Sequence, residues 1–145
     1  MKSVLYVFIA LIFLACGNTR KTKTSDSTNS PVQLKDRVEV LYFHGKQRCQ
    51  TCNAIEDLAK EVVDTLFARE LKEGKVVYKV IDISKKENDS IANKYEVTWS
   101  SLFINKWKDG QETPANMTDF AFTNVLASPA LFKEGIKKKI TEQLE

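Results

Sequence analysis

Blocks of apolar and polar residues predict an ordered series of strands and helices from residue 38 onward. Residues 38–43 are apolar at nearly every position and rich in β-branched and aromatic side chains, which is typical of a strand inside a covered sheet. The next long segment, 52–72, is predicted to be a helix. Its apolar side chains alternate at intervals of three and one and form one stripe: Ile55, Leu58, Ala59, Val62, Val63, Leu66 and Phe67. Gly74 marks the expected end of this helix.

The rest of the chain carries similar apolar patterns in shorter segments. They predict strands over 76–83, 102–107 and 111–113, and helical segments over 84–95, 117–126 and 129–144. Lys108-Asp109-Gly110 has the composition of a tight hairpin turn, so the last two strands are expected to be antiparallel. The helical connections, in contrast, imply parallel strands.

Local signals indicate where the shorter helices begin. Ser84 followed by Glu87 is a capping box, which predicts that Ser84 caps the helix after the second strand. Ser128 and Pro129 are a typical N-cap and first helical residue. The last helix is expected to bury one apolar face, made by Leu131, Phe132, Ile136, Ile140 and Leu144.

The first sixteen residues have the features of an export signal. Lys2 supplies one positive charge, and residues 4–15 form an unbroken apolar run of twelve. Such a run is too short for a bilayer span of about 20 residues but suits a signal-peptide core. It ends at Phe13-Leu14-Ala15-Cys16, which resembles a bacterial lipobox with Cys16 as the lipid-carrying residue, although Leu is usual where Phe13 stands. A plain secretory signal and an uncleaved anchor are the alternatives.

Residues 17–31 consist mainly of Ser, Thr, Asn and Lys, without a large apolar side chain. This composition predicts a flexible tether between a membrane anchor and a folded domain over 32–145. In some bacterial groups an acidic run just after the lipid-carrying cysteine resembles a surface-export signal. No such run follows Cys16, which favours the periplasmic side of the bacterial cell envelope. We therefore expect a lipid-anchored domain that faces the periplasm.

The charge balance gives no footprint for nucleic acid. The whole chain has a formal net charge of +3, but residues 32–145 contain 18 basic and 18 acidic side chains. A nucleic-acid-binding domain would be expected to carry a clear basic excess. We expect no nucleic-acid partner and a monomeric protein.

The three cysteines divide into one candidate for lipidation and one close pair. Cys49 and Cys52 lie between a predicted strand and a predicted helix, where free N–H groups and the helix dipole favour a thiolate. The pair is therefore either a redox couple or a small, permanently oxidised loop. Half a zinc site is the third reading, but the chain has no second cysteine pair and only one histidine, His44. We expect no metal and no cofactor.

A strand leading into a Cys-x-x-Cys helix, followed by strand, helix, strand, strand and helix, resembles the thioredoxin superfamily. The resemblance covers residues 38–144, and its specific part is the position of Cys49 and Cys52. It implies a three-layer α/β fold with a central mixed four-stranded sheet flanked by helices. It also implies a thiol–disulfide oxidoreductase that acts on protein thiols and disulfides in the cell envelope. The alternative is a thioredoxin-like binding module that has lost redox activity.

By this resemblance, Cys49 is the exposed reactive thiol and Cys52 resolves the mixed disulfide that Cys49 forms. Arg48 and Lys46 are candidates for stabilising the thiolate, with an ordinary exposed basic loop as the alternative. Gln50-Thr51 replaces the Gly-Pro that is common between the cysteines, a dipeptide that tunes the reduction potential in this superfamily.

The chain departs from the pattern of the superfamily at three places. Arg48 stands where Trp is usual, and Tyr42-Phe43 occupies the place of a buried acid, so proton transfer from Cys52 would need another base or water. Ser100 or Ser101 takes the position of a cis-proline. Because a cis bond before a non-proline residue costs ~2.5–4 kcal/mol, we expect a trans bond or a locally altered loop there. The missing ring leaves room beside the sulfurs for a serine hydroxyl or a metal.

Two further side chains and one segment belong to the candidate site with open roles. Trp99 either covers the site or lies in the core. His44, with an ordinary pKa near 6.5, is either a proton carrier near Cys49 or, as we favour, a hydrogen-bonded structural residue. The segment 114–126 is longer than the superfamily usually has there, and either covers the site or serves packing.

Overall fold

The structure is a computed structural model that describes residues 36–145. The predicted signal segment, lipidation at Cys16 and tether over 17–31 lie outside the described residues, so the predicted domain boundaries remain predictions. None of the helices between residues 36 and 145 has the length and apolar character needed to cross a bilayer.

The described part is an α/β structure with four strands, five α-helices and one 3₁₀ turn. In chain order the elements are β1 (Arg37–His44), α1 (Gln50–Leu66), α2 (Ala68–Lys72), β2 (Val76–Asp82), the 3₁₀ turn η1 (Lys86–Asn88), α3 (Asp89–Lys94), β3 (Ser101–Lys108), β4 (Gln111–Thr113), α4 (Thr118–Asn124) and α5 (Pro129–Leu144). Every predicted strand is present within two residues of its predicted bounds.

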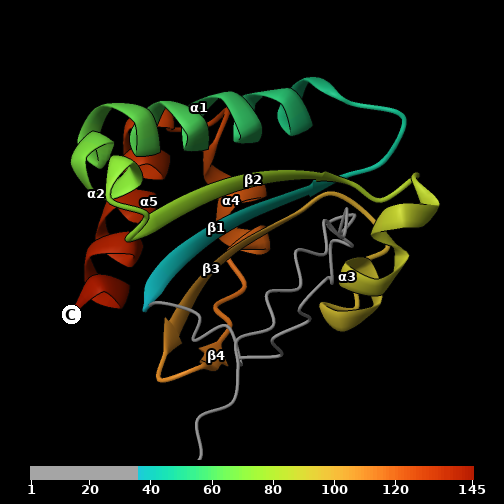
Figure 1. The fold of residues 1–145 in the computed structure, drawn as a ribbon. Helices are drawn as coiled ribbons and strands as arrows, with labels where there is room; N and C mark the ends of the chain where they lie inside the picture. The colour runs from blue at the N-terminus through green and yellow to red at the C-terminus, as the bar shows by residue number, and fades with distance from the viewer. Residues whose placement is uncertain (1–35) are drawn as a thin grey trace, which may run out of the picture. The chain divides into compact units, whose positions relative to one another are not determined.

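The strands form one open mixed sheet in the order β2-β1-β3-β4 (Figure 1). β1 pairs with β2 in parallel and with β3 antiparallel, and β3 and β4 form the predicted antiparallel hairpin. At the turn of that hairpin Asp109 and Gly110 both have positive φ, as the turn type requires. The central position of β1 fits its apolar character on both faces.

The expectation that the helical connections join parallel strands is right for β1 and β2 but wrong for β3. In the register, Phe43 at the end of β1 is opposite Ser101 at the start of β3. A parallel β3 would require the connection to run back along about 26 Å of strand. The six residues of α3 cover only about 9 Å. The chain therefore re-enters the sheet at the end where β2 left it.

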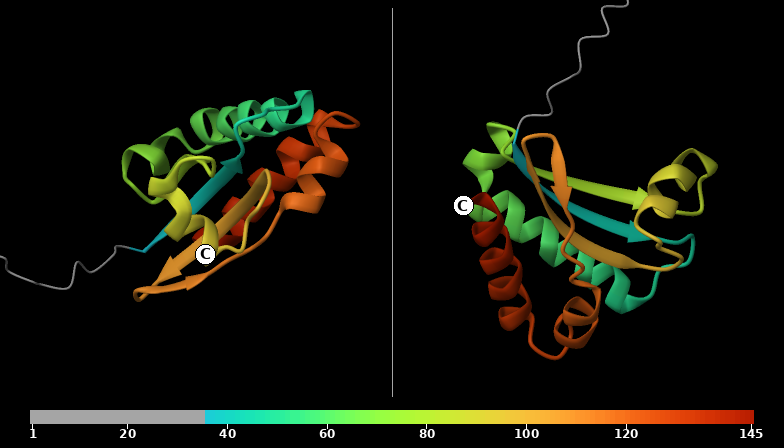
Figure 2. Two further views of the ribbon diagram at one scale, coloured as in Figure 1. Left: turned by 90° about the vertical axis from the view of Figure 1, so that its right-hand side faces the viewer. Right: turned by 90° about the horizontal axis from the view of Figure 1, so that it is seen from below.

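The two faces of the sheet carry separate apolar cores. Val38, Val40 and Tyr42 of β1 face the larger core, to which α1, α4 and α5 contribute, and Figure 2 shows α1 and α5 on the same side of the sheet. Leu41 and Phe43 face the smaller core, which α3 covers. This strict alternation aims Tyr42 at the underside of α1, where the cysteines lie.

Three local predictions about the helices are wrong, and one holds only in part. The helix predicted over 52–72 begins at Gln50 and is interrupted at buried Phe67, which has φ −123° and ψ 25°. Ser84 does not cap the following helix, because its N–H and hydroxyl both donate to Asp82. Ser128 occupies the predicted N-cap position of α5, but its side chain makes no cap bond. Leu131 and Leu144 are 53% and 37% exposed, so neither joins the buried face of α5.

The segment before α4 extends the sheet beside β3. The N–H of Ile104 donates to the Ala115 carbonyl, and the N–H of Met117 donates to the Leu102 carbonyl. The buried Thr118 hydroxyl accepts from the N–H of Leu102. The longer connection over 114–126 is therefore fixed to the strand that begins next to the candidate site.

Candidate functional site

The cysteine pair lies at the end of the sheet where the loop after β1 meets α1 (Figure 1). Cys49 and Cys52 form a disulfide with their Cα atoms 5.1 Å apart. Cys49 is exposed, whereas Cys52 is buried at 7% exposure. One sulfur is thus accessible from solvent while the other lies against the protein interior.

Cys49 is the N-cap residue of α1. Its sulfur accepts a hydrogen bond from the N–H of Cys52 at 3.1 Å, and the first turn of the helix holds no acidic residue. The seventeen-residue helix directs the positive end of its dipole at this position. Negative charge on the Cys49 sulfur would be stabilised there.

Two hydroxyl groups contact Cys52 although this residue is buried. The hydroxyl of Tyr42 donates to the Cys52 carbonyl at 2.7 Å. On the other side, the Ser100 hydroxyl donates to the Cys52 sulfur at 3.6 Å. Burial raises the pKa of Tyr42, although the Ser100 and Arg48 side chains act in the opposite direction. Tyr42 is therefore a neutral phenol that can donate and accept hydrogen bonds beside the disulfide.

Arg48 is not a free cation, because it is ion-paired within the site. Its guanidinium forms an ion pair with Glu56, one turn beyond Cys52 on α1, and lies over the Tyr42 ring at 5.8 Å. Burial lowers the pKa of Arg48, but the bond to Glu56 outweighs this and the net direction is upward. Its Nε is buried and has no hydrogen-bond partner within the described chain. The positive charge next to Cys49 is thus largely balanced by Glu56.

The other residues of the loop and first helical turn are more exposed. Lys46 is exposed, Gln50 and Thr51 are the first two residues of α1, and of these Gln50 is exposed and Thr51 half-buried. The structure gives neither Gln50 nor Thr51 a contact that would define a role. Their predicted influence on the reduction potential stays a prediction.

His44 is held by local contacts. One of its ring nitrogens, Nδ1, lies 2.9 Å from the Gly45 carbonyl, and its ring stacks on Tyr42 with centroids 6.2 Å apart. The backbone carbonyl of His44 accepts from the N–H of Ile83. These contacts hold the His44 ring at the end of β1, and the role of His44 in the site stays a prediction.

The loop before β3 delivers Ser100 to the buried sulfur. Ser100 is 7% exposed and contacts Cys52, whereas the Ser101 hydroxyl turns back to the Trp99 carbonyl at 3.1 Å. No peptide bond in residues 36–145 is cis, so the predicted trans bond is confirmed. Of the two serines, it is Ser100 that reaches the space left by the missing proline ring.

Trp99 is not a core residue. It is 54% exposed, and its ring contacts Phe122 of α4 with centroids 5.1 Å apart. Ala121 and Val125 of the same segment are buried in the larger core. The long connection therefore serves packing with one face, while its Phe122 meets the tryptophan that precedes Ser100.

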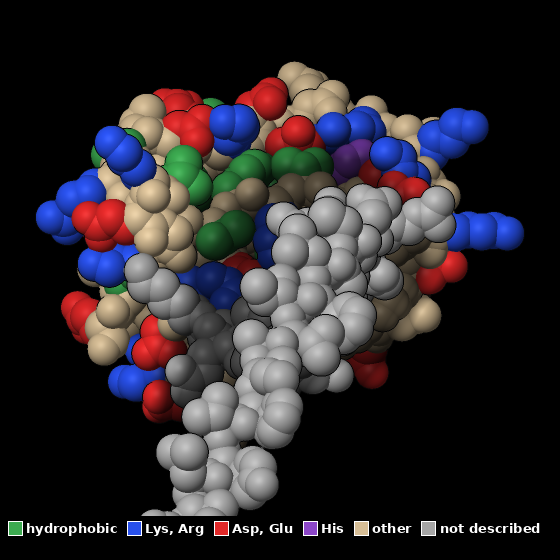
Figure 3. Space-filling model, viewed as in Figure 1, with side chains coloured by type: hydrophobic (Ala, Val, Ile, Leu, Met, Phe, Trp, Pro, Cys, Tyr) green, Lys and Arg blue, Asp and Glu red, His purple; other side chains and the backbone are tan. Residues whose placement is uncertain are grey.

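Among residues 36–145, no three histidine, cysteine or acidic side chains are placed to hold a metal ion. On the face of the molecule that Figure 3 shows, the Lys and Arg side chains of the described residues are interspersed with Asp and Glu.

The sequence did not predict two contacts of the candidate site. Tyr42 was noted for lacking a carboxylate, but its hydroxyl contacts the Cys52 carbonyl. The signal was present, since Tyr42 continues the alternation of Val38 and Val40 on the face that meets α1. The pairing of Glu56 with Arg48 is the other contact, and no local sequence pattern indicates it.

Comparisons with known proteins identify no family for this chain. No family model and no curated protein matches the sequence. A solved structure of a malarial protein is similar at 20% sequence identity and a TM-score of 0.41, over 68% of this chain and 96% of that chain. The cysteine pair and the mixed α/β sheet are compatible with a thioredoxin-like fold.

Proposed function

We propose that this protein is a thiol–disulfide oxidoreductase of the thioredoxin-like type, working through Cys49 and Cys52. The observation that supports this proposal is the asymmetry of the disulfide: Cys49 is exposed at a helix N-terminus, and Cys52 is buried beneath it. A purely structural staple has no need for an accessible sulfur at a site that favours a thiolate.

In the proposed reaction a partner thiolate attacks the exposed sulfur of Cys49. The Cys49–Cys52 bond breaks, a bond between Cys49 and the partner sulfur forms, and the electron pair moves to Cys52. A second partner thiolate then releases the dithiol and leaves the partner oxidised. In the reverse direction the Cys49 thiolate opens a partner disulfide, and Cys52 resolves the mixed species.

The test is dithiol-dependent reduction of a protein disulfide such as insulin by the full chain. The proposal expects turnover that Cys49→Ser abolishes, with Cys52→Ser trapping a mixed disulfide at Cys49. Equal rates for the parent and Cys49→Ser would reject the enzymatic role. Trapping in the native cell would also name the partner and the direction of electron flow.

We further propose that the protein is attached to the bacterial cell envelope by lipid at Cys16 and faces the periplasm. The support is the sequence alone: a short charged start, an apolar run over 4–15 and the lipobox-like end. Cys16→Ser should move the protein from the membrane fraction to the soluble fraction. Retention of that variant in the membrane would favour an uncleaved anchor instead.

The second candidate is a redox-inactive binding module of the envelope. It is favoured by the pairing of Arg48 with Glu56, which balances the positive charge directly before Cys49 in the sequence, and by the exposed Trp99. A Cys49 thiol with an ordinary pKa near 8.5 and a pair that mild dithiols never open would support this candidate over the enzyme.

A further inference from the structure

The buried sulfur of Cys52 has a hydrogen-bond partner, the Ser100 hydroxyl, which takes no part in the exchange reaction described above. In the disulfide the Cys52 sulfur carries no proton, so the 3.6 Å contact requires Ser100 to be the donor. Both residues are 7% exposed, so little water reaches the contact. A charge that develops on this sulfur must be stabilised by protein groups or not at all.

We infer that the Ser100 hydroxyl is the hydrogen-bond donor that stabilises the Cys52 thiolate when the disulfide is opened. This inference rests on the proposed function, because the thiolate arises as the leaving group of that reaction. When a partner thiolate attacks Cys49, the electron pair of the broken bond moves to the Cys52 sulfur. Ser100 keeps its proton and donates a hydrogen bond that strengthens as the charge grows.

Tyr42 limits how strongly Ser100 can donate in the oxidised form. The proton of the Tyr42 hydroxyl is committed to the Cys52 carbonyl, so toward Ser100 this hydroxyl can only accept. The Ser100 proton thus has two acceptors, the Tyr42 oxygen and the Cys52 sulfur. A thiolate is a far better acceptor than a disulfide sulfur, so reduction should draw the proton toward Cys52.

Arg48 does not replace this donor. Its guanidinium lies over the Tyr42 ring and is paired with Glu56. The first turn of α1 contributes backbone N–H groups, but the N–H of Cys52 already points to the Cys49 sulfur. Ser100 is therefore a catalytic residue in the strict sense, because its hydroxyl touches a reacting atom.

The experiment uses the full chain with Cys16→Ser and Cys49→Ser, which leaves Cys52 as the single thiol, and follows thiolate absorbance against pH. Adding Ser100→Ala should raise the measured pKa of the Cys52 thiol by about one unit, a tenfold change in the ionisation equilibrium. Ser100→Thr keeps the hydroxyl and should restore the parental value. Ser101→Ala is the matched control, because that hydroxyl faces the Trp99 carbonyl instead of a sulfur.

Tyr42→Phe gives the second, oppositely directed readout. It removes the competing acceptor and should lower the pH at which the Cys52 thiolate forms, whereas general loosening of the site would move both variants the same way. In the native pair, Ser100→Ala should slow opening by dithiothreitol about threefold to tenfold, because a leaving thiol of higher pKa departs more slowly.

An unchanged Cys52 titration in Ser100→Ala, or an upward shift in Tyr42→Phe, would overturn the inference. Failure of the proposed function is seen separately, as a parental pair that reduces no protein disulfide. The single-thiol titration remains readable in that case, so the two results can be told apart.

Discussion

At the scale of single residues, the pair of Arg48 and Glu56 decides how much positive charge Cys49 experiences. The guanidinium directly before Cys49 is bound to the Glu56 carboxylate and not left free. Opposite charges in contact present little net field to a third group a few ångströms away. The site therefore depends on backbone N–H groups and the helix dipole more than on this cation.

Neutralising Glu56 should make Cys49 more reactive. In a Cys52→Ser background, Glu56→Gln should lower the pKa of the Cys49 thiol and speed its alkylation near pH 6 about twofold to fivefold, since a nearby cation favours a thiolate. The measurement is the pH dependence of iodoacetamide labelling on the Cys49 peptide. Glu61→Gln, whose partner is Lys133 on α5, is the control. Equal labelling profiles for Glu56→Gln and its parent would contradict the electrostatic account.

A second carboxylate, Glu39, is buried on the face of β1 away from α1 and α5. It accepts hydrogen bonds from Arg37, Lys79 and the Trp107 indole. Burial raises the pKa of Glu39, but the bonds to Lys79 and Arg37 prevail and hold it below the ordinary value of 4.5. A carboxylate whose pKa is lower in the folded state stabilises the fold at pH values above its unfolded-state pKa. This contribution is lost as the pH falls through the folded-state pKa.

Glu39→Gln should therefore lower the free energy of unfolding by about 1–3 kcal/mol at pH 7. The difference from the parent should shrink as pH falls below 4.5, as measured by urea unfolding across this range. Glu134→Gln is the control, because this exposed residue makes only a surface contact with Lys137. A Glu39→Gln penalty that is constant with pH would show that the lost charge is not the cause.

At the scale of secondary structure, local patterns predicted what local forces determine. The stripe on α1 lies where predicted except for Leu66, which is 54% exposed, and the Asp109-Gly110 turn and Pro129 at the start of α5 are also as predicted. The break at Phe67 and the direction of β3 were not predictable, because both depend on how elements pack and how far a short connection reaches. The same holds for the site, where spacing predicted Cys49 and Cys52 but not the tertiary contacts of Tyr42 and Glu56.

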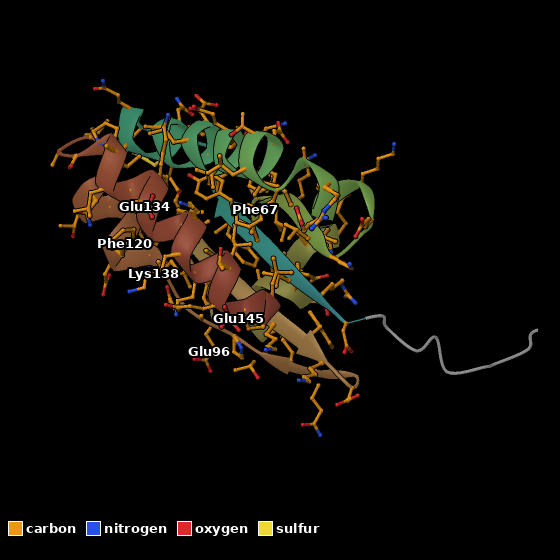
Figure 4. All side chains as sticks on the ribbon, turned by 90° about the vertical axis from the view of Figure 1, so that its left-hand side faces the viewer. Phe67, Glu96, Phe120, Glu134, Lys138 and Glu145 are labelled. Carbon is orange, nitrogen blue, oxygen red and sulfur yellow. A yellow bond between two sulfur atoms is a disulfide. The ribbon has the colours of Figure 1, made fainter. Side chains whose placement is uncertain are left out.

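At Gly135 of α5 the neighbouring helix α4 leaves no room for a side chain. A Cβ added there would overlap the ring of Phe120, which Figure 4 shows beside α5 and which stacks on Phe132. Gly135→Ala should gain about 1 kcal/mol of helix propensity but lose about 1–3 kcal/mol through overpacking. We expect a net loss of stability in thermal or urea unfolding.

Phe120→Leu is the partner variant that tests this cause, because it removes the ring that the new methyl group meets. Combined with Phe120→Leu, Gly135→Ala should become neutral or stabilising, so the double-mutant cycle should show a coupling of about 1 kcal/mol or more. If Gly135→Ala alone stabilises the parent, the Phe120 ring moves aside at little cost and the close approach is not required.

At the scale of the whole molecule, the disulfide is peripheral to what holds the domain together. It closes a loop with a sequence separation of only 3, while the larger core joins β1, β3, α1, α4 and α5 through many buried side chains, of which Tyr42 also contacts Cys52. Loop entropy predicts that so small a ring contributes about 2 kcal/mol to stability. The fold should therefore survive reduction, as a reversible redox site requires.

Reduction should lower the free energy of unfolding by about 2 kcal/mol and leave a single cooperative transition. The measurement is urea unfolding followed by far-UV circular dichroism, with and without dithiothreitol. The double variant Cys49→Ser/Cys52→Ser should have the same free energy of unfolding as the reduced protein, and dithiothreitol should not change it. Because 1.4 kcal/mol corresponds to about 30 mV for a dithiol pair, the same difference reports how far folding shifts the potential of the pair. Loss of the cooperative transition on reduction would instead make the disulfide a structural staple, and the proposed exchange chemistry would fail with it.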